Sequence, residues 1–289
     1  MLPTIRVFVL NPAYLHSSRS YNLTMQFHPL QHDVIQGDVQ GTQLTIESQL
    51  TSANLDNGEY VVLQEMTVSG WSMDIHAVSD IGSVEWALGL ATQYGVWLQV
   101  GWAKRKGDRG LNCVTICSPD GNIVATYEKL YTCNPFQEDT TYDCGQELVI
   151  IEINGTRICP LICYDLRFPE LWRLAALAGV DVFTVSSSWP LLRINHWTFL
   201  LIARAIENQA YVVGANRIGS DAIATWGGHS MILSAKGEIL AQCGDAEVAT
   251  ISSELDVVSS SSWREEFPVL DDIKAELLGS INVQQITAC

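Results

Sequence analysis

The sequence predicts a mixed α/β fold, and three observations lead to this prediction. Short apolar segments rich in β-branched residues recur along the chain, bounded by Gly, Asn, Asp or Pro, as is typical of strands. Helical patterns interrupt these segments, so neither class of element forms an unbroken run. The stretches CSPDGNIVATYEK and LSAKGEILAQCG contain DGN and KGE turns, which favour β-hairpins. Because hairpins join antiparallel strands, a purely parallel sheet is not expected.

The elements follow one another from the N-terminus as strands with helices between them. The predicted strand segments are 5–10, 59–65, 95–103, 111–118, 122–129, 148–153, 156–163, 180–188, 209–217, 230–243 and 248–255. The predicted helices cover 80–94, 169–179 and 195–209. The second helix begins with Pro169 and closes on Gly179, which are favourable start and stop residues.

We expect a single domain over residues 1–289, because no repeat and no Pro- or Gly-rich linker divides the chain. The segment near 22–58 is atypical, and its polar part at 38–58 carries a weak pattern. The tail after about residue 270 is equally weak. No element is predicted in either region.

Composition excludes several classes of partner. The chain has 289 residues, is 47% hydrophobic and carries 32 acidic against 16 basic residues, a formal charge of -16. Nucleic acid and an anionic membrane surface are therefore not expected as partners. No apolar run reaches the roughly 18 residues of a membrane span, and the start MLPTIRVFVLNPAY lacks the features of a signal peptide. We therefore expect a soluble, cytoplasmic protein.

Eight cysteines occur, and several lie inside apolar runs where cysteine packs as a small hydrophobe. Reduced thiols are expected in a cytoplasmic chain of this length. The two CxxxC spacings have no partner ligands at zinc-site spacing, so no metal is predicted. A redox pair of Cys159 and Cys163 is the alternative from another functional class. On one strand these residues would lie about 13 Å apart, too far for a disulfide.

Cys163 lies where an apolar strand meets a helix that starts with Pro169. Such a turn can expose a nucleophile beside backbone N–H groups, and a helix N-terminus favours the thiolate. Taken alone, however, a cysteine after an apolar strand is more often a core residue. A cysteine hydrolase also needs a base, and no histidine stands in a catalytic motif. Glu65 and Lys129 are the other candidates, because each follows an apolar strand segment.

Three separated motifs resemble the nitrilase superfamily of carbon-nitrogen hydrolases. They are VVLQEMTVSGW with Glu65, YEKLYTCNPFQEDTTYDCG with Lys129, and PLICYDLRFPELWR with Cys163. The later stretches SSSWPLLRINHWTFLLIARAIENQAYVVGANRIGSD, GGHSMILSAKGEIL and WREEFPVLDD are similar to the omega-amidase branch. The chain departs from the family pattern at Gln64, where proline is usual, and at Tyr131, where histidine is common.

The resemblance implies a four-layer αββα sandwich that forms a homodimer or higher homo-oligomer and uses no cofactor. It also implies roles for the matched residues. Glu65 is the general base for the Cys163 thiol, and Lys129 favours the thiolate. Lys129 and the backbone N–H of Tyr164 stabilise the oxyanion. Glu138, in the second motif, positions the lysine and the attacking water.

The expected substrate is a small linear amide, and the best match is 2-oxoglutaramate or 2-oxosuccinamate. Arg167 or Arg193, in a segment with Trp189, is a candidate for binding a substrate carboxylate. Structural ion pairing is the alternative role for both arginines. Within the same superfamily, a nitrilase, an N-carbamoyl hydrolase or an aliphatic amidase is the alternative activity, and a silent scaffold is a further one.

Overall fold

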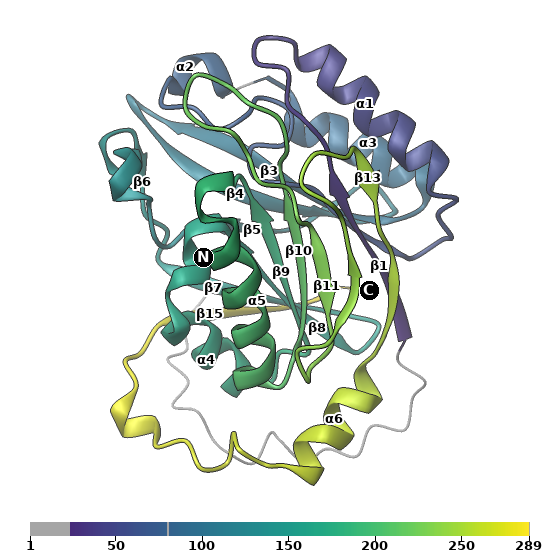
Figure 1. The fold of residues 1–289 in the computed structure, drawn as a ribbon, viewed down its shortest axis with the longest axis vertical. Helices are drawn as coiled ribbons and strands as arrows, with labels where there is room; N and C mark the ends of the chain where they lie inside the picture. Colours follow the sequence, from purple (N-terminus) through teal and green to yellow (C-terminus); the bar gives the residue numbers. More distant parts are fainter. Residues whose placement is uncertain (1–23, 80, 289) are drawn as a thin grey trace, which may run out of the picture.

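Two mixed β-sheets pack against each other in the part of the chain that the computed structural model describes, residues 24–79 and 81–288 (Figure 1). The predicted strand at 5–10 lies outside the described residues. The first sheet contains β1 (Thr24–Gln31), β2 (Tyr60–Val62), β3 (Trp97–Lys106), β4 (Arg109–Cys117), β5 (Ile123–Glu128), β6 (Tyr142–Asp143), β13 (Ala249–Thr250) and β14 (Ser253–Asp256). The second contains β7 (Glu147–Ile153), β8 (Thr156–Ile162), β9 (Val182–Ser187), β10 (Tyr211–Asn216), β11 (Met231–Leu233), β12 (Ile239–Gln242) and β15 (Asn282–Ala288).

The strand order explains how both predicted hairpins fit into the sheets. In the first sheet the order is β13-β1-β2-β3-β4-β5, with β14 beside β1 and β6 beside β4. In the second it is β12-β11-β10-β9-β8-β7-β15. The β4–β5 and β11–β12 pairs are antiparallel, as the turn sequences predict, whereas β8, β9 and β10 run parallel.

Helices cover the outer face of each sheet. The longer helices are α1 (Val39–Ser52), α3 (Ser83–Tyr94), α4 (Pro169–Leu177), α5 (Ile194–Asn208) and α6 (Val257–Glu266), and α2 (Ile75–Val78) is a single turn. Helices α1 and α3 share one apolar cluster with the first sheet, and α4 and α5 share another with the second sheet (Figure 1). The order helix, sheet, sheet, helix confirms the four-layer αββα prediction.

Strand β2 and the residue after it pack against a different layer on each face. Tyr60 and Val62 belong to the cluster that includes the second sheet, whereas Val61 and Leu63 pack beneath α1 and α3. Successive side chains of a strand point to opposite faces, so a continuous apolar run fits a strand buried on both sides. The backbone then continues beside β3 to Glu65, three residues beyond the strand end.

The weak patterns at 38–58 and after residue 270 misled the prediction, because both regions contain regular elements. Asp38 caps the N-terminus of helix α1, and its carboxylate accepts from the Gly41 amide at 2.8 Å. Only Thr42, Ile46 and Leu50 of the helix are buried. This stripe is too narrow to stand out in sequence. In the tail, β15 pairs in parallel with β7, and its exposed polar side chains conceal the strand pattern.

Candidate active site

A cavity of about 340 Å³ opens where strands of both sheets end. The residues that line it are Glu65, Trp71, Lys129, Cys133, Pro135, Phe136, Cys163, Tyr164, Arg167, Ser188, Trp189, Pro190, Arg193, His196 and Trp226. Every candidate residue from the sequence lines this cavity except Glu138, which is fully buried behind Lys129. The three separated motifs therefore meet at one place.

Cys163 is the first residue after β8 and begins a 3-10 turn, η4 (Cys163–Arg167). Its φ of 44° lies in the left-handed region, an uncommon conformation for a residue with a side chain. The carboxylate of Asp165 holds this turn by accepting from the Ile162 amide at 3.0 Å, the Tyr131 amide at 3.0 Å and the Tyr127 hydroxyl at 2.8 Å. The turn thus keeps the thiol at the cavity wall, a placement typical of a nucleophile.

The protonation state of Cys163 differs from the sequence-based expectation of a favoured thiolate. Burial of the sulfur raises the pKa of Cys163 well above its usual value, and Glu65 raises it further. Lys129 acts in the opposite direction but does not outweigh them, because its charge is shared with two carboxylates. Cys163 is therefore a thiol at neutral pH, and its Sγ donates weakly to the Ser188 carbonyl at 3.8 Å. Attack by this sulfur would need a base to remove its proton.

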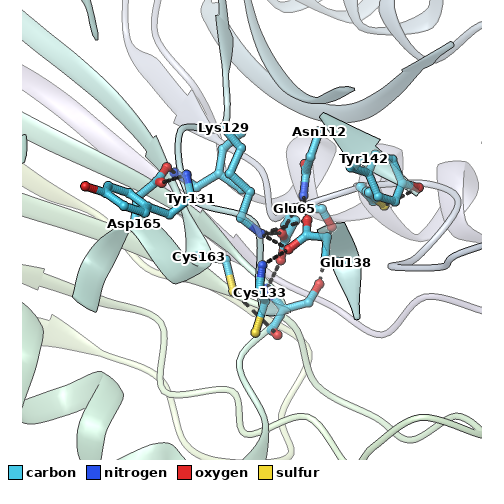
Figure 2. Close-up of polar contacts among 12 residues, drawn as sticks. Glu65, Asn112, Lys129, Tyr131, Cys133, Glu138, Tyr142, Cys163 and Asp165 are labelled. Atoms are coloured by element: carbon cyan, nitrogen blue, oxygen red, sulfur yellow. Dashed lines mark hydrogen bonds and ion pairs between the residues drawn. The ribbon is translucent and has the colours of Figure 1, made fainter. Parts of the chain in front are cut away.

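Glu65, Lys129 and Glu138 form a buried charge cluster, and at most 1% of each side chain is exposed (Figure 2). Lys129 Nζ donates to Glu65 Oε1 at 2.9 Å and to both Glu138 oxygens at 3.0 and 2.8 Å. Burial by itself lowers the pKa of Lys129, but Glu138 and Glu65 outweigh it and raise that pKa well above its usual value. The lysine therefore remains a cation beside Cys163.

The second oxygen of Glu65 is also fixed. Glu65 Oε2 accepts from the Ser188 amide at 2.9 Å. Gly101 of β3 passes so close that a Cβ there would lie 2.9 Å from the Glu65 Cα. The adjacent strand therefore permits only glycine at this contact, which fixes the backbone that carries Glu65.

The outer part of the cavity is aromatic and cationic. The Arg167 guanidinium stacks over the Trp189 ring at 4.6 Å, and that of Arg193 stacks over Phe136 at 5.2 Å. Among the described residues, no carboxylate forms an ion pair with Arg167 or Arg193. The structural ion pairs considered as their alternative role are therefore not formed there. Both guanidinium groups retain donors that can bind an anionic ligand.

The two departures from the family pattern have different surroundings. Tyr131 stacks on Phe168 with ring centroids 3.6 Å apart and donates its hydroxyl to Glu170 at 3.1 Å. The lysine loop is therefore packed tightly with tyrosine in this position. Gln64 is fully buried, and its amide atoms have no hydrogen-bond partner within residues 24–79 and 81–288.

The redox alternative does not fit the positions of the cysteines. Cys159 is fully buried within β8 in the hydrophobic core, whereas Cys163 reaches the cavity. The cysteines of the described chain are free thiols. A different thiol, Cys133, shares the cavity with Cys163. In the described residues no group of three or more His, Cys, Asp and Glu side chains gathers to hold a metal ion.

Sequence reasoning missed several residues that support the site. Asn112 of β4 donates to Glu65 and Glu138, and Ser188 donates to Glu65 from the end of β9. Asp165 holds the turn at Cys163 and was visible in the third motif only as part of YDLR. Asn112 gave one signal, a polar residue within the apolar run LNCVTIC. Of the aromatic walls, Trp71 and Phe136 lie within the first and second motifs, whereas Trp226 gave no signal.

The comparisons with known proteins agree with this geometry. The sequence pattern of the carbon-nitrogen hydrolase family matches residues 29–265. The 2-oxoglutaramate amidase of Bacillus subtilis (strain 168) is 35% identical over 226 residues, 76% of this chain and 87% of that protein. The omega-amidase YafV of Yersinia enterocolitica is 33% identical over 258 residues, 88% of this chain and 99% of that protein. The chain therefore belongs to the carbon-nitrogen hydrolase family.

Solved structures give the same assignment. The CN-hydrolase superfamily protein XC1258 from Xanthomonas campestris aligns with a TM-score of 0.81 at 25% identity, covering 89% of this chain and all of that one. Nit3 of Saccharomyces cerevisiae, a nitrilase superfamily member, aligns with a TM-score of 0.77 at 25% identity, covering 85% and 95%. Together with the amidase relatives, these matches identify the chain as a hydrolase of amide bonds, as the sequence predicted. None of the described helices is long and apolar enough to cross a membrane.

Proposed function

We propose that this protein is an omega-amidase with a Glu65, Lys129 and Cys163 triad, which hydrolyses the terminal amide of a short 2-oxo dicarboxylic acid monoamide. 2-Oxoglutaramate and 2-oxosuccinamate are the candidate substrates. The relatives named 2-oxoglutaramate amidase and omega-amidase support this substrate class. Acid and ammonia are the products.

The division of the cavity into two ends carries this proposal. The inner end holds the Cys163 thiol between a carboxylate and an ammonium, which suits attack on an amide carbonyl. The outer end holds Arg167 and Arg193 without an ion-pair partner among the described residues. A guanidinium group binds a carboxylate through paired N–H donors. A linear molecule with an amide at one end and a carboxylate at the other satisfies both ends.

The first half of the reaction uses Glu65 as the base. Glu65 accepts the proton from Cys163 while the sulfur attacks the amide carbon, which is needed because the resting thiol is protonated. The carbonyl oxygen becomes an oxyanion, and Lys129 Nζ and the Tyr164 amide stabilise it. Glu65 then gives its proton to the departing nitrogen. Ammonia leaves, and the acyl group remains bound to Cys163 as a thioester.

The second half reverses these steps with water. Glu65 accepts a proton from a water molecule as it attacks the thioester carbon. The second oxyanion forms at the same place, so the same donors serve both halves. The carbon–sulfur bond breaks, the sulfur regains the proton from Glu65, and the carboxylic acid leaves. Glu138 keeps Lys129 in position through both halves, because it accepts two hydrogen bonds from the ammonium.

The test is ammonia release from a panel of substrates. The panel contains 2-oxoglutaramate, 2-oxosuccinamate, a neutral aliphatic amide, an aliphatic nitrile and an N-carbamoyl amino acid. We expect the first two to be hydrolysed with the highest kcat/KM. Cys163→Ala should abolish turnover, whereas Cys144→Ser, at an exposed thiol outside the cavity, should leave it unchanged. Full turnover by Cys163→Ala, or a preference for the nitrile or the carbamoyl compound, would refute the proposal.

We also propose a cytoplasmic homodimer that associates through helix α5. Phe199 and Ile206 on this helix are 68% and 51% exposed, and Leu192 just before it is 88% exposed. Large apolar side chains gathered on one face favour a protein interface. The free thiols support a reducing compartment. Sedimentation of the wild type and of Phe199→Glu tests the dimer, and an unchanged mass for the variant would contradict the use of this face.

A further inference from the structure

Asn112 of β4 lies at the centre of the buried charge cluster. Its Nδ2 donates to Oε1 of Glu65 at 2.8 Å and to Oε1 of Glu138 at 2.9 Å. The same two oxygens accept from Nζ of Lys129 at 2.9 and 3.0 Å. These four atoms form a closed ring in which two nitrogen donors alternate with two carboxylate oxygens (Figure 2).

The orientation of the Asn112 amide follows from its neighbours. If the carbonyl oxygen faced the carboxylates, three acceptors would crowd together, so the NH2 group must face them. Asn112 is 1% exposed, and its Oδ1 has no hydrogen-bond partner in the part of the chain that is described. A buried acceptor without a donor is unfavourable. The orientation of the Asn112 side chain is therefore fixed by its two N–H bonds to the carboxylate oxygens. Its carbonyl oxygen contributes no hydrogen bond to this orientation.

The charges explain why such a neutral donor matters. Two buried carboxylates share one ammonium, and two like charges at short distance favour a proton on one of them. The other titratable groups that face the cluster are Cys133, Tyr142, Cys163 and Asp165. Burial raises the pKa of Cys133, Tyr142 and Cys163, so these three groups are neutral at neutral pH. Burial raises the pKa of Asp165 to about 6, so its carboxylate adds a negative charge near Lys129 at neutral pH. Each N–H donated to a carboxylate favours its ionised form.

We propose that Asn112 is a positioning residue that holds the carboxylates of Glu65 and Glu138 around Lys129 through its two N–H donors. Glu65 then remains free to accept the proton of Cys163, while Glu138 retains Lys129. Asn112 does not line the cavity, so it acts only through these groups. The inference rests on the proposed function, because it concerns the base of that reaction.

The test compares Asn112→Leu, which has similar volume but no donor, with the wild type. We expect kcat/KM for the preferred amide to fall about 10- to 100-fold at neutral pH. We also expect the acid limb of the kcat/KM profile to move to higher pH, because the variant lacks both N–H donors. Thr115→Val is the matched control, since Thr115 is buried in the same strand but bonds Trp102 and Thr126.

The pH profile separates this role from a merely structural one. A loss of activity by the same factor at every pH, with an unmoved acid limb, would overturn the inference. If Asn112→Leu does not fold, Asn112→Ser provides the same comparison, because a shorter hydroxyl cannot donate to both carboxylates. If the wild type is active and Asn112→Leu has the same acid limb, this inference is wrong while the proposed function stands. A wild type that releases ammonia from no amide overturns the proposed function and, with it, this inference.

Discussion

Lys129→Met removes the only ammonium of the buried charge cluster while keeping a side chain of similar length. Lys129 is 1% exposed, and its partners Glu65 and Glu138 are 1% and 0% exposed. Removing one partner of a buried ion pair leaves charge without compensation, which typically costs about 3 to 5 kcal/mol. Because these groups are buried, solvent does not reduce this magnitude as it does at the surface.

The test compares the free energies of unfolding of the wild type and Lys129→Met, measured by urea denaturation at pH 7. We expect Lys129→Met to lose about 3 to 5 kcal/mol, and Lys129→Met combined with Glu138→Gln to recover part of this loss. Lys104→Met is the control, because Lys104 pairs with Glu128 at 3.2 Å with 47% and 35% of the side chains exposed. A pair of this kind contributes about 1 kcal/mol or less.

The pH dependence of this loss also follows from the pKa of Lys129. That pKa is raised above the usual value of 10.5, so the stabilisation is fully present below about pH 10.5. It is lost only as the pH rises through the higher, folded-state pKa. The difference between wild type and variant should therefore be the same at pH 7 and pH 9. A loss below about 1 kcal/mol, matching Lys104→Met, would refute the claim that this cluster is a tightly coupled ion pair.

Three further predictions concern the substrate end, the backbone at the base and the nucleophile. Arg167→Met and Arg193→Met should each raise KM for the anionic monoamide about 10- to 100-fold, because a charge-assisted hydrogen bond contributes about 1.5 to 3 kcal/mol. The KM for a neutral amide should stay nearly unchanged. Equal effects on both substrates in steady-state kinetics would contradict carboxylate binding. Gly101→Ala should lower both activity and stability, since its Cβ would lie 2.9 Å from the Glu65 Cα; unchanged kcat and an unchanged Tm would show that the strand yields there. Alkylation of Cys163 by iodoacetamide, followed by mass spectrometry, should keep accelerating above pH 9, because burial and Glu65 raise the pKa of the thiol; a plateau at neutral pH would contradict this.

Much of the fold was predictable because local patterns carry it. Strands that are buried on both faces appear in the sequence as continuous apolar runs. The DGN and KGE turns predict the β4–β5 and β11–β12 hairpins, which the sheets contain. Strand β1 was missed although it is mostly buried, whereas α1 and β15 were missed for one shared physical cause. Helix α1 and strand β15 expose most of their side chains, so their structure depends on backbone pairing and on a few buried contacts rather than on an apolar pattern.

For the site, the sequence by itself predicted the triad and Glu138 but not the supporting residues Asn112, Ser188 and Asp165. Glu65, Lys129 and Cys163 each follow a strand segment, and their motifs carry the family resemblance. The protonation of Cys163 was decided only by the tertiary structure. The prediction was that Lys129, a cation near the sulfur, favours the thiolate, but in the fold two carboxylates share that charge and the sulfur is buried.

The same reason explains Asn112 and the two arginines. Hydrogen bonds and ion pairs form between strands that lie far apart in the sequence, as from Asn112 to Glu65, so the sequence shows the donor without its acceptor. The sequence left the roles of Arg167 and Arg193 open between structural pairing and substrate binding. In the described residues both guanidinium groups lie over aromatic rings and form no ion pair with a carboxylate, which supports substrate binding. The sequence determined the chemical groups of this protein, and the tertiary structure decided their charges and partners, because both depend on what surrounds a group in space.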